Sequence, residues 1–219
     1  MAAYQACYFW AVSLAGVAVT ALVSICSSPI FITLLAAKFL GEKLTLKIYL
    51  ALGLGLVGTS LLVINPQATN LQGGQFMGGV LVALGAGLAY GIYAVGAKAV
   101  IKNLDPFLVL ALSFTIAGVL LSPSLLFTNS KIAYNWLLQI PFLLYLGLVA
   151  TGFAYLIYMQ GLKSTKATVA AIAVLLEPLT ATCLGIVIFH ESIGISRAIG
   201  GFLLLGTIAL LSIQKQHKT

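Results

Sequence analysis

The nine residues VLLEPLTAT, from Val174 to Thr182, place a glutamate directly before a proline in the middle of an apolar run. The run extends from Ala167 to Phe189 and is long enough to cross a bilayer. A carboxylate at the centre of a membrane costs roughly 2.5–3.5 kcal/mol on insertion scales, so such a residue usually has a function. Glu177 is therefore the first candidate for chemistry, either as a contact for a solute or as a group that gains and loses a proton.

Pro178 gives this glutamate a structural alternative. A proline has no N–H, so the carbonyl of Val174 loses its helical donor, and a protonated Glu177 could donate a hydrogen bond to it. At helical spacing, small residues share the face of Glu177: Ala170, Ala173, Thr180 and Ala181. The opposite face carries Ile172, Leu175, Leu179 and Ile186. The pattern predicts that the small face, with Glu177 and Thr180, lines a cavity inside a helical bundle, and that the bulky face meets lipid.

The surroundings of Pro178 occur a second time, in SSPIFITLLAAKFLGEKL and again in LEPLTATCLGIVIFHESI. Pro29 pairs with Pro178 and Glu42 with Glu191 at one offset, without a gap (178 − 29 and 191 − 42 are both 149). The paired prolines are predicted to kink their helices.

Ser28 is the counterpart of Glu177 at this offset, and Ser24 precedes it by one helical turn. We therefore expect both serines to line the same cavity, beside the kink at Pro29. Because only one of the two copies carries an acid, this cavity would be chemically asymmetric.

Two pairs of tyrosines lie in mid-span at a spacing of three residues, Tyr90 with Tyr93 and Tyr155 with Tyr158. A tyrosine in such a position either donates its hydroxyl to a backbone group or lines a pocket for apolar and amphipathic solutes. All four are candidate cavity residues.

Glu42 and Glu191 lie at helix ends, on opposite membrane surfaces. Each could stabilise the N-terminus of the next helix, or close an ion-pair gate with Lys43 or Arg197.

The two histidines are single residues, so no metal site is expected. In a further pattern, Gly79, Ala83, Gly87 and Gly91 form a stripe of small residues, which indicates close helix packing rather than a hinge or a dimer motif.

Membrane-spanning helices must position these residues. Hydrophobic residues make up 61% of the 219 and charged residues 7%, against about 45–50% and about 25% in a soluble domain. We therefore predict an all-α, polytopic membrane helical bundle. Apolar runs predict seven full spans, near 17–40, 46–64, 76–97, 107–127, 137–162, 167–189 and 197–213. Tyr4 to Leu14 is a partial span, which looks like the second half of a helix whose beginning is absent.

Positive charge follows the order of the spans. Nine of the eleven basic residues lie at one set of alternating ends: Lys38, Lys43, Lys47, Lys98, Lys102, Lys163, Lys166, Lys215 and Lys218. This bias predicts a multi-pass protein of the plasma (inner) membrane, with the C-terminus and the loops near residues 42, 100 and 164 in the cytoplasm. The charge-free linker Asn65 to Gln75 would lie outside. Because the lysines punctuate apolar runs and form no patch, no nucleic-acid partner is expected.

The two proline segments lie five spans apart, an odd number, so they must point in opposite directions. This is an inverted-topology repeat, the architecture of many secondary transporters. The two copies, and GGVLVALGAGLAYGIYAVGAKAVI between them, resemble the EamA-type transporters of the drug/metabolite transporter superfamily. The resemblance implies ten helices in two inverted halves. Residues 1–66 would be a truncated N-terminal repeat that lacks roughly its first two helices, and residues 67–219 a complete C-terminal repeat of five helices.

These features favour a secondary transporter that moves small organic metabolites or drugs by alternating access, with Glu177 as the entry for protons if transport is proton-coupled. The alternative is a non-transporting remnant or subunit that needs a partner supplying the missing helices. An enzyme would need clustered acids, histidines or a nucleophile with a base, and the sequence has no such cluster and no nucleotide motif. The expected partners are a small-molecule substrate and the lipid bilayer, with a homo-oligomer or a complementary membrane subunit left open, and no cofactor is expected.

Overall fold

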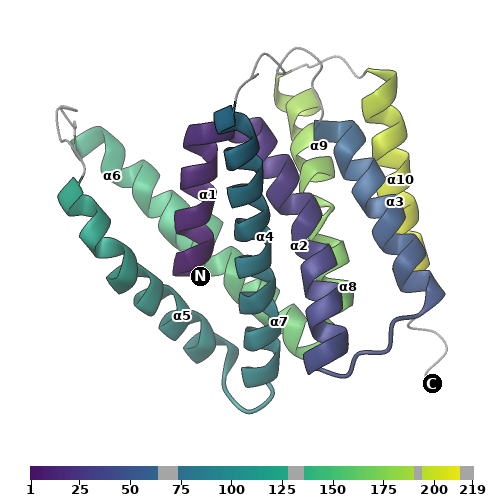
Figure 1. Cartoon of the computed structure of the whole chain (residues 1–219), viewed down its shortest axis with the longest axis horizontal. Helices are drawn as coiled ribbons and strands as arrows, with labels where there is room; N and C mark the ends of the chain where they lie inside the picture. The colour runs from purple at the N-terminus through teal and green to yellow at the C-terminus, as the bar shows by residue number, and fades with distance from the viewer. Residues whose placement is uncertain (64–73, 128–135, 190–193, 213–219) are drawn as a thin grey trace. The chain divides into compact units, whose positions relative to one another are not determined.

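The computed structural model describes residues 1–63, 74–127, 136–189 and 194–212, and the regular structure in these ranges is entirely helical (Figure 1). Its elements are α1 Ala2–Ala15, α2 Val17–Phe39, α3 Leu46–Val63, α4 Gly74–Val100, α5 Pro106–Leu121, η2 Ser122–Phe127, α6 Trp136–Leu144, η3 Tyr145–Phe153, α7 Ala154–Ser164, α8 Ala167–Val174, α9 Glu177–Phe189 and α10 Ile195–Ser212. The element η2 is a 3-10 helix, and η3 is a π-helix of 9 residues.

Helical segments occupy all seven predicted spans. Five are long and apolar enough to cross a membrane: Val17–Phe39, Gln75–Val100, Pro106–Ser124, Gln139–Ser164 and Ala167–Ile188. Two shorter apolar segments, Leu46–Leu62 and Ala198–Leu211, belong to α3 and α10. The prediction of an all-α membrane helical bundle is confirmed. The π-helical middle of the fifth span, between α6 and α7, was not predicted.

The described residues form two separate compact units. The larger unit comprises Ala3–Val95 and Lys166–Thr219, and the smaller comprises Gly96–Thr165 with Met1–Ala2. The larger unit contains both proline segments and the small-residue stripe of α4.

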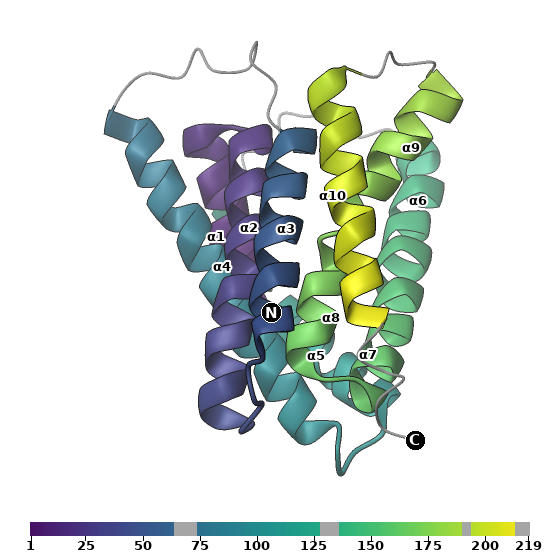
Figure 2. The ribbon, with the colours of Figure 1, turned by 90° about the vertical axis from the view of Figure 1, so that its right-hand side faces the viewer.

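Within the larger unit, α3 and α10 lie side by side and run in opposite directions (Figure 2). Their closest approach is at a pair of glycines. A Cβ on Gly58 would lie 2.9 Å from the carbonyl oxygen of Gly200, and a Cβ on Gly200 would lie 2.7 Å from that of Gly58. Any larger side chain at either position would push these backbones apart.

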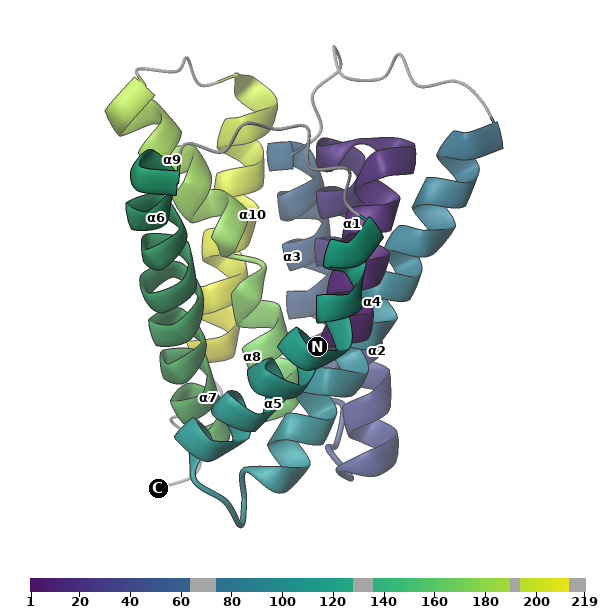
Figure 3. The same cartoon turned by 90° about the vertical axis from the view of Figure 1, so that its left-hand side faces the viewer.

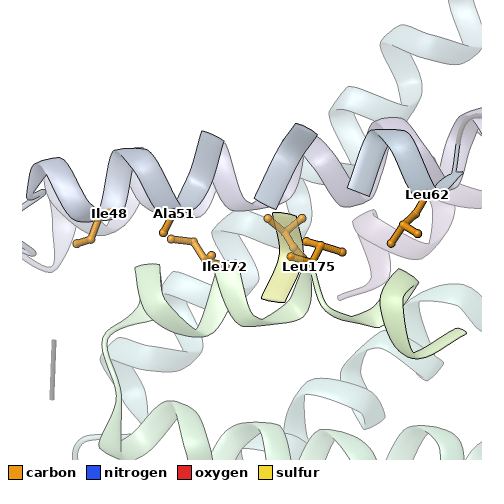
Figure 4. Close-up of a cluster of buried hydrophobic side chains, with 6 residues drawn as sticks. Ile48, Ala51, Leu62, Ile172 and Leu175 are labelled. Carbon is orange, nitrogen blue, oxygen red and sulfur yellow. The ribbon is translucent and has the colours of Figure 1, made fainter. Parts of the chain in front are cut away.

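The α8 helix packs onto this pair through a cluster of buried apolar side chains (Figure 4). The cluster consists of Ile48, Ala51, Leu62, Ile172, Leu175 and Leu204. Leu175 fills the space left by Gly55, because a Cβ there would lie 2.7 Å from Leu175 Cδ1. The prediction that the face bearing Ile172 and Leu175 meets lipid is therefore wrong. Glycines in α3 leave room for these side chains, so bulky residues mark a helix contact here.

The small-residue stripe of α4 packs against α1 and α2. A Cβ on Gly79 would lie 2.6 Å from that of Ala15, and one on Gly91 would lie 3.1 Å from that of Phe31. Ser24 of α2 donates a hydrogen bond across the contact to the carbonyl of Ala83, at 3.2 Å. Close packing, the role expected for this stripe, is what the structure shows.

The two proline segments run in opposite directions within the larger unit (Figures 1 and 2). The segment that follows α2 lies beside the beginning of α8, because Glu42 binds the backbone amide of Ala167. From there α8 and α9 lead back toward the end at which α2 begins. The helices α2 and α8 are in direct contact.

In the smaller unit, α5 packs against α7, as the lower part of Figure 3 shows. Asp105 caps the N-terminus of α5 by accepting a hydrogen bond from the amide of Phe107, at 2.8 Å. The ammonium group of Lys98 donates to three carbonyls at the end of α7, those of Leu162, Lys163 and Thr165, at 2.5, 3.2 and 2.6 Å. The segments near residues 98 and 164 therefore lie at the same end of this unit, as the predicted alternation of spans requires.

Candidate functional site

The segment that carries Glu177 is discontinuous directly before this residue. The helix α8 ends at Val174 and α9 begins at Glu177. Between them, the amides of Leu175 and Leu176 donate to carbonyls three residues back instead of four, each at 3.1 Å. Because Pro178 has no N–H to offer, the regular ladder cannot pass through this point.

Thr59 of α3 forms a hydrogen bond with the backbone at the discontinuity. Its hydroxyl is fully buried and donates to the carbonyl oxygen of Leu175, at 3.3 Å. Within the described part of the chain, no hydrogen bond joins the Glu177 carboxyl to a backbone carbonyl. Thr59 therefore binds the carbonyl next to the one that Pro178 deprives of its donor.

Glu177 is exposed, at the first residue of α9. Its charge acts on the hydroxyl groups of Tyr4 and Tyr8 in α1. The carboxylate also lies in the first turn of α9, where the helix dipole stabilises a negative charge. Other residues on this face, Ala173, Thr180 and Ala181, are exposed as well. The face that carries Glu177 is thus made of small, exposed residues.

The ring of Tyr4 packs against one of the predicted tyrosine pairs. Its ring centroid lies 5.8 Å from that of Tyr8 and 5.3 Å from that of Tyr90, and Tyr90 lies 6.1 Å from Tyr93. These rings are tilted at 47°, 55° and 48° to one another and are all half-buried. We call Tyr4, Tyr8, Tyr90 and Tyr93 the tyrosine cluster. Together with Glu177 it forms the candidate site.

The two predicted serines lie in a helix contact. Ser24 is buried and bonded to Ala83, and Ser28 is buried and donates to the carbonyl of Ser24, at 2.6 Å. Their hydroxyls stay close to the backbone around Pro29, through which α2 continues without interruption. Thr180 of α9 is exposed, and it donates to the carbonyl of Leu176 at 3.2 Å.

The second predicted tyrosine pair belongs to the smaller unit. Tyr155 and Tyr158 lie 6.2 Å apart on α7, and Tyr155 meets the edge of Phe114 of α5 at 5.2 Å. These rings contribute to the packing of α5 against α7.

Glu42 binds the N-terminus of α8, at a different helix from the one expected. Its carboxylate accepts hydrogen bonds from the amides of Ala167 and Thr168, at 2.6 and 3.1 Å, and from the hydroxyl of Thr168, at 2.7 Å. The expected partner was the next helix, α3, and the observed partner lies 125 residues away along the chain. Glu191, its counterpart at the 149-residue offset, lies outside the described residues.

Sequence reasoning missed Tyr4 and Thr59. Tyr4 precedes Tyr8 by four residues, so the two share one face of α1, and this spacing could have suggested a pair. Thr59 is one polar residue in a glycine-rich apolar helix, and its partner is 116 residues distant. No local pattern indicates such a contact.

Comparison with known proteins identifies the family. Residues 77–213 match the model described as the EamA-like transporter family. The chain is 32% identical over 223 residues to the uncharacterized transporter YwfM of Bacillus subtilis (strain 168), with 100% of this chain and 73% of that protein covered. It is 27% identical over 205 residues to an uncharacterized transporter of Archaeoglobus fulgidus, with 94% and 70% covered.

A solved crystal structure shares the fold, with a TM-score of 0.85 at 21% identity, over 100% of this chain and 74% of the other. It shows the arrangement of the helices alone. The family match and the 32% identical relative decide the classification, and they confirm the resemblance seen in the two proline segments. This chain is a multi-pass membrane protein that belongs to the EamA-like transporter family.

Proposed function

We propose that this chain is a secondary transporter of small organic solutes, which works by alternating access and has Glu177 on the solute path. The observation that carries the proposal is the discontinuous segment α8–α9, with an exposed carboxylate at the break. Broken helices near the membrane midplane are where many secondary transporters bind their solutes and coupling ions. Family membership supports a transporter of the drug/metabolite superfamily.

The arrangement of the larger unit supports the same function. The two proline segments run in opposite directions and touch, as alternating access between inverted repeats requires. Helices approach closely at Gly58 and Gly200 and along the α4 stripe, where no large side chain stands between them. Such smooth contacts allow helices to slide or rock against each other.

In this proposal Glu177 also couples transport to protons. Its carboxyl can take up a proton on one side of the membrane and release it on the other, because no hydrogen bond holds it to a backbone carbonyl in the described part of the chain. Its charge acts on the hydroxyls of Tyr4 and Tyr8. We place the protein in the plasma (inner) membrane, where a proton gradient is available to such a carrier.

Transport by the purified protein in proteoliposomes tests this function. A panel of radiolabelled neutral, basic and aromatic amino acids, amines and organic acids is offered with and without a pH gradient. We expect uptake of at least one solute above the level of empty vesicles, at a rate that the gradient changes. The variant Glu177→Gln should remove the dependence on pH. Asp105→Asn is the matched control, because it also removes one carboxylate yet keeps a good helix cap.

The proposal fails if the wild-type protein moves no member of the panel faster than empty vesicles do. If uptake occurs and responds to pH identically in the wild type and in Glu177→Gln, transport stands but the role of Glu177 in coupling is refuted.

A further inference from the structure

Two groups of helices in the larger unit are each packed closely within themselves. The first group is α1, α2 and α4, where α4 approaches α1 at Gly79 and α2 at Gly87 and Gly91. The second group is α3, α8 and α10, which share the buried apolar cluster and approach each other closely at Gly58 and Gly200. Because these contacts lie inside a group, each group can move as one body.

Glu42 joins the two groups. Its backbone amide and that of Leu40 both donate to the carbonyl of Ala36, at 3.2 and 3.0 Å. Between them Gly41 has a φ of 65°, which turns the chain and which glycine adopts without strain. The end of α2 therefore fixes the position of Glu42. The carboxylate of the same residue accepts all three hydrogen bonds from the N-terminus of α8, so its backbone belongs to the first group and its side chain binds the second.

This contact lies where it can break and form again. Glu42 is half-buried and stands between two exposed residues, Gly41 and Lys43. Water can bind the first amides of a helix in place of a side chain, and it can also hydrate the carboxylate. Separation of α2 from α8 would therefore expose both partners to water together, with neither left buried and unpaired.

The two halves of the second proline segment differ in burial. The helix α8, which Glu42 binds, buries four of its 8 residues. Among the residues of α9 whose side chains the structure describes, Pro178 alone is buried. The segment is thus packed at the end where Glu42 lies and much less covered beyond the break. A carrier whose path is closed at the Glu42 end has this arrangement.

We propose that Glu42 is a latch, which holds the two groups together at the end predicted to be cytoplasmic and releases α8 when the solute path opens on that side. Upon release α2 moves away with Glu42, whereas the buried apolar cluster keeps α8 on α3. Residues 43–45, between Glu42 and α3, take up the movement. This inference rests on the proposed transport function, since alternating access requires each end of the path to open in turn.

Distances between spin labels in the purified protein, without any solute, test the latch. The native cysteines are replaced by alanine, and labels are attached at Lys38→Cys on α2 and Lys166→Cys before α8, both exposed positions. Electron paramagnetic resonance should give mainly one short distance. Glu42→Ala should add a longer distance and raise the ratio of open to closed protein roughly 5- to 30-fold. Glu42→Gln should raise it less, because one acceptor oxygen remains.

A second variant removes a single hydrogen bond of the latch. Thr168→Val deletes the hydroxyl that donates to Glu42 and keeps the shape of a buried side chain, so it should shift the distances less than Glu42→Ala does. Thr207→Val is the matched control, because Thr207 is also buried but its hydroxyl bonds within α10, to the carbonyl of Leu203. Equal shifts in the two threonine variants would overturn the latch, since the loss of any buried hydroxyl would then suffice.

A control for the carboxylate separates a latch from a helix cap. Asp105 also caps a helix N-terminus, but the helix is its own, α5. Asp105→Asn should therefore keep the parental distance. Gel filtration and thermal midpoints establish that each variant is folded, and the distances are measured well below the midpoints, where lower stability alone leaves them unchanged. A parental distance in folded Glu42→Ala would overturn the latch.

A reversible tether tests whether transport requires the release. Lys43→Cys and Lys166→Cys each adjoin a latch residue in sequence, so a short bifunctional methanethiosulfonate can link them across the contact. The link should stop uptake of the solute found in proteoliposomes, and a reductant should restore it. The same reagent on either single cysteine is the control and should leave uptake unchanged. Undiminished uptake by fully linked protein would overturn the latch.

The outcomes separate this inference from the proposed function. A longer distance in Glu42→Ala, without transport of any solute by the wild type, would support the latch and refute the proposed function. Transport by the wild type, with the parental distance kept in folded Glu42→Ala, would overturn the latch and leave the proposed function standing.

Discussion

Glu42 shows how a single carboxylate can bind together the two proline segments. It accepts three hydrogen bonds at the N-terminus of α8, where the unpaired amides and the helix dipole favour a negative charge. An N-terminal cap contributes about 1 kcal/mol, and up to about 2 kcal/mol in favourable cases. We expect Glu42→Ala to lower the free energy of unfolding by about this amount, and Glu42→Gln to lower it less, because one acceptor oxygen remains.

The measurement is thermal unfolding, followed by a thiol-reactive dye at the native cysteines, which lie in α1, α2 and α9. Lys43→Ala is the neighbouring control: Lys43 is exposed, so its truncation should leave the midpoint nearly unchanged. A midpoint of Glu42→Ala equal to that of Lys43→Ala would show that the carboxylate contributes nothing to stability.

Residues at the site differ in how far the sequence reveals them. Glu177 stands out because an acid in an apolar run is costly, and Tyr90 stands out by its position in mid-span. Thr59 and the partner of Glu42 do not stand out, because both act on backbone groups more than 100 residues away. The wrong prediction that the Leu175 face meets lipid has the same cause. In a membrane, a bulky side chain is equally suited to contact with lipid and with a helix. Only the glycines of another helix decide between the two.

At the scale of the helices, glycines with open space and glycines in contact have opposite effects when replaced. A Cβ on Gly87 would meet the Ser27 side chain and lie 3.3 Å from the Ser28 amide nitrogen, whereas a Cβ on Gly85 would meet nothing within 4 Å. Both lie in the interior of α4, so alanine gains about 0.5–1 kcal/mol of helical preference at either position. We expect Gly87→Ala to be destabilising by about 1–3 kcal/mol, as in overpacked cores, and Gly85→Ala to be neutral or stabilising.

Comparison of the two thermal midpoints checks this prediction, and each variant is the other's control for helix propensity. Equal midpoints would mean that α4 and α2 are not as closely packed as the structure has them.

The existence and order of the helices followed from apolar length alone. The interruption at Leu175 and Leu176 had a sequence signal in Pro178, but the π-helix at Tyr145–Phe153 had none, since its composition is that of an ordinary span.

At the scale of the whole molecule, the charge bias predicts the orientation in the membrane. The contact between Glu42 and α8, and that between Lys98 and the end of α7, each join segments predicted to be cytoplasmic. Each contact lies within one unit, so each independently supports the alternation of spans on which the orientation depends. The assignment of these ends to the cytoplasmic side depends on the distribution of positive charge: nine lysines lie at these ends.

Cysteine labelling in cells decides the orientation. In a background with Cys7, Cys26 and Cys183 replaced by alanine, we introduce Gln67→Cys in the charge-free linker and Asn103→Cys in the exposed segment after α4. A membrane-impermeant maleimide should label position 67 in intact cells and position 103 only after permeabilisation, with no labelling of the cysteine-free parent. The reverse pattern would invert the orientation. Labelling of both positions from one side would mean that α4 does not cross the membrane, and the two proline segments would then no longer be antiparallel across it.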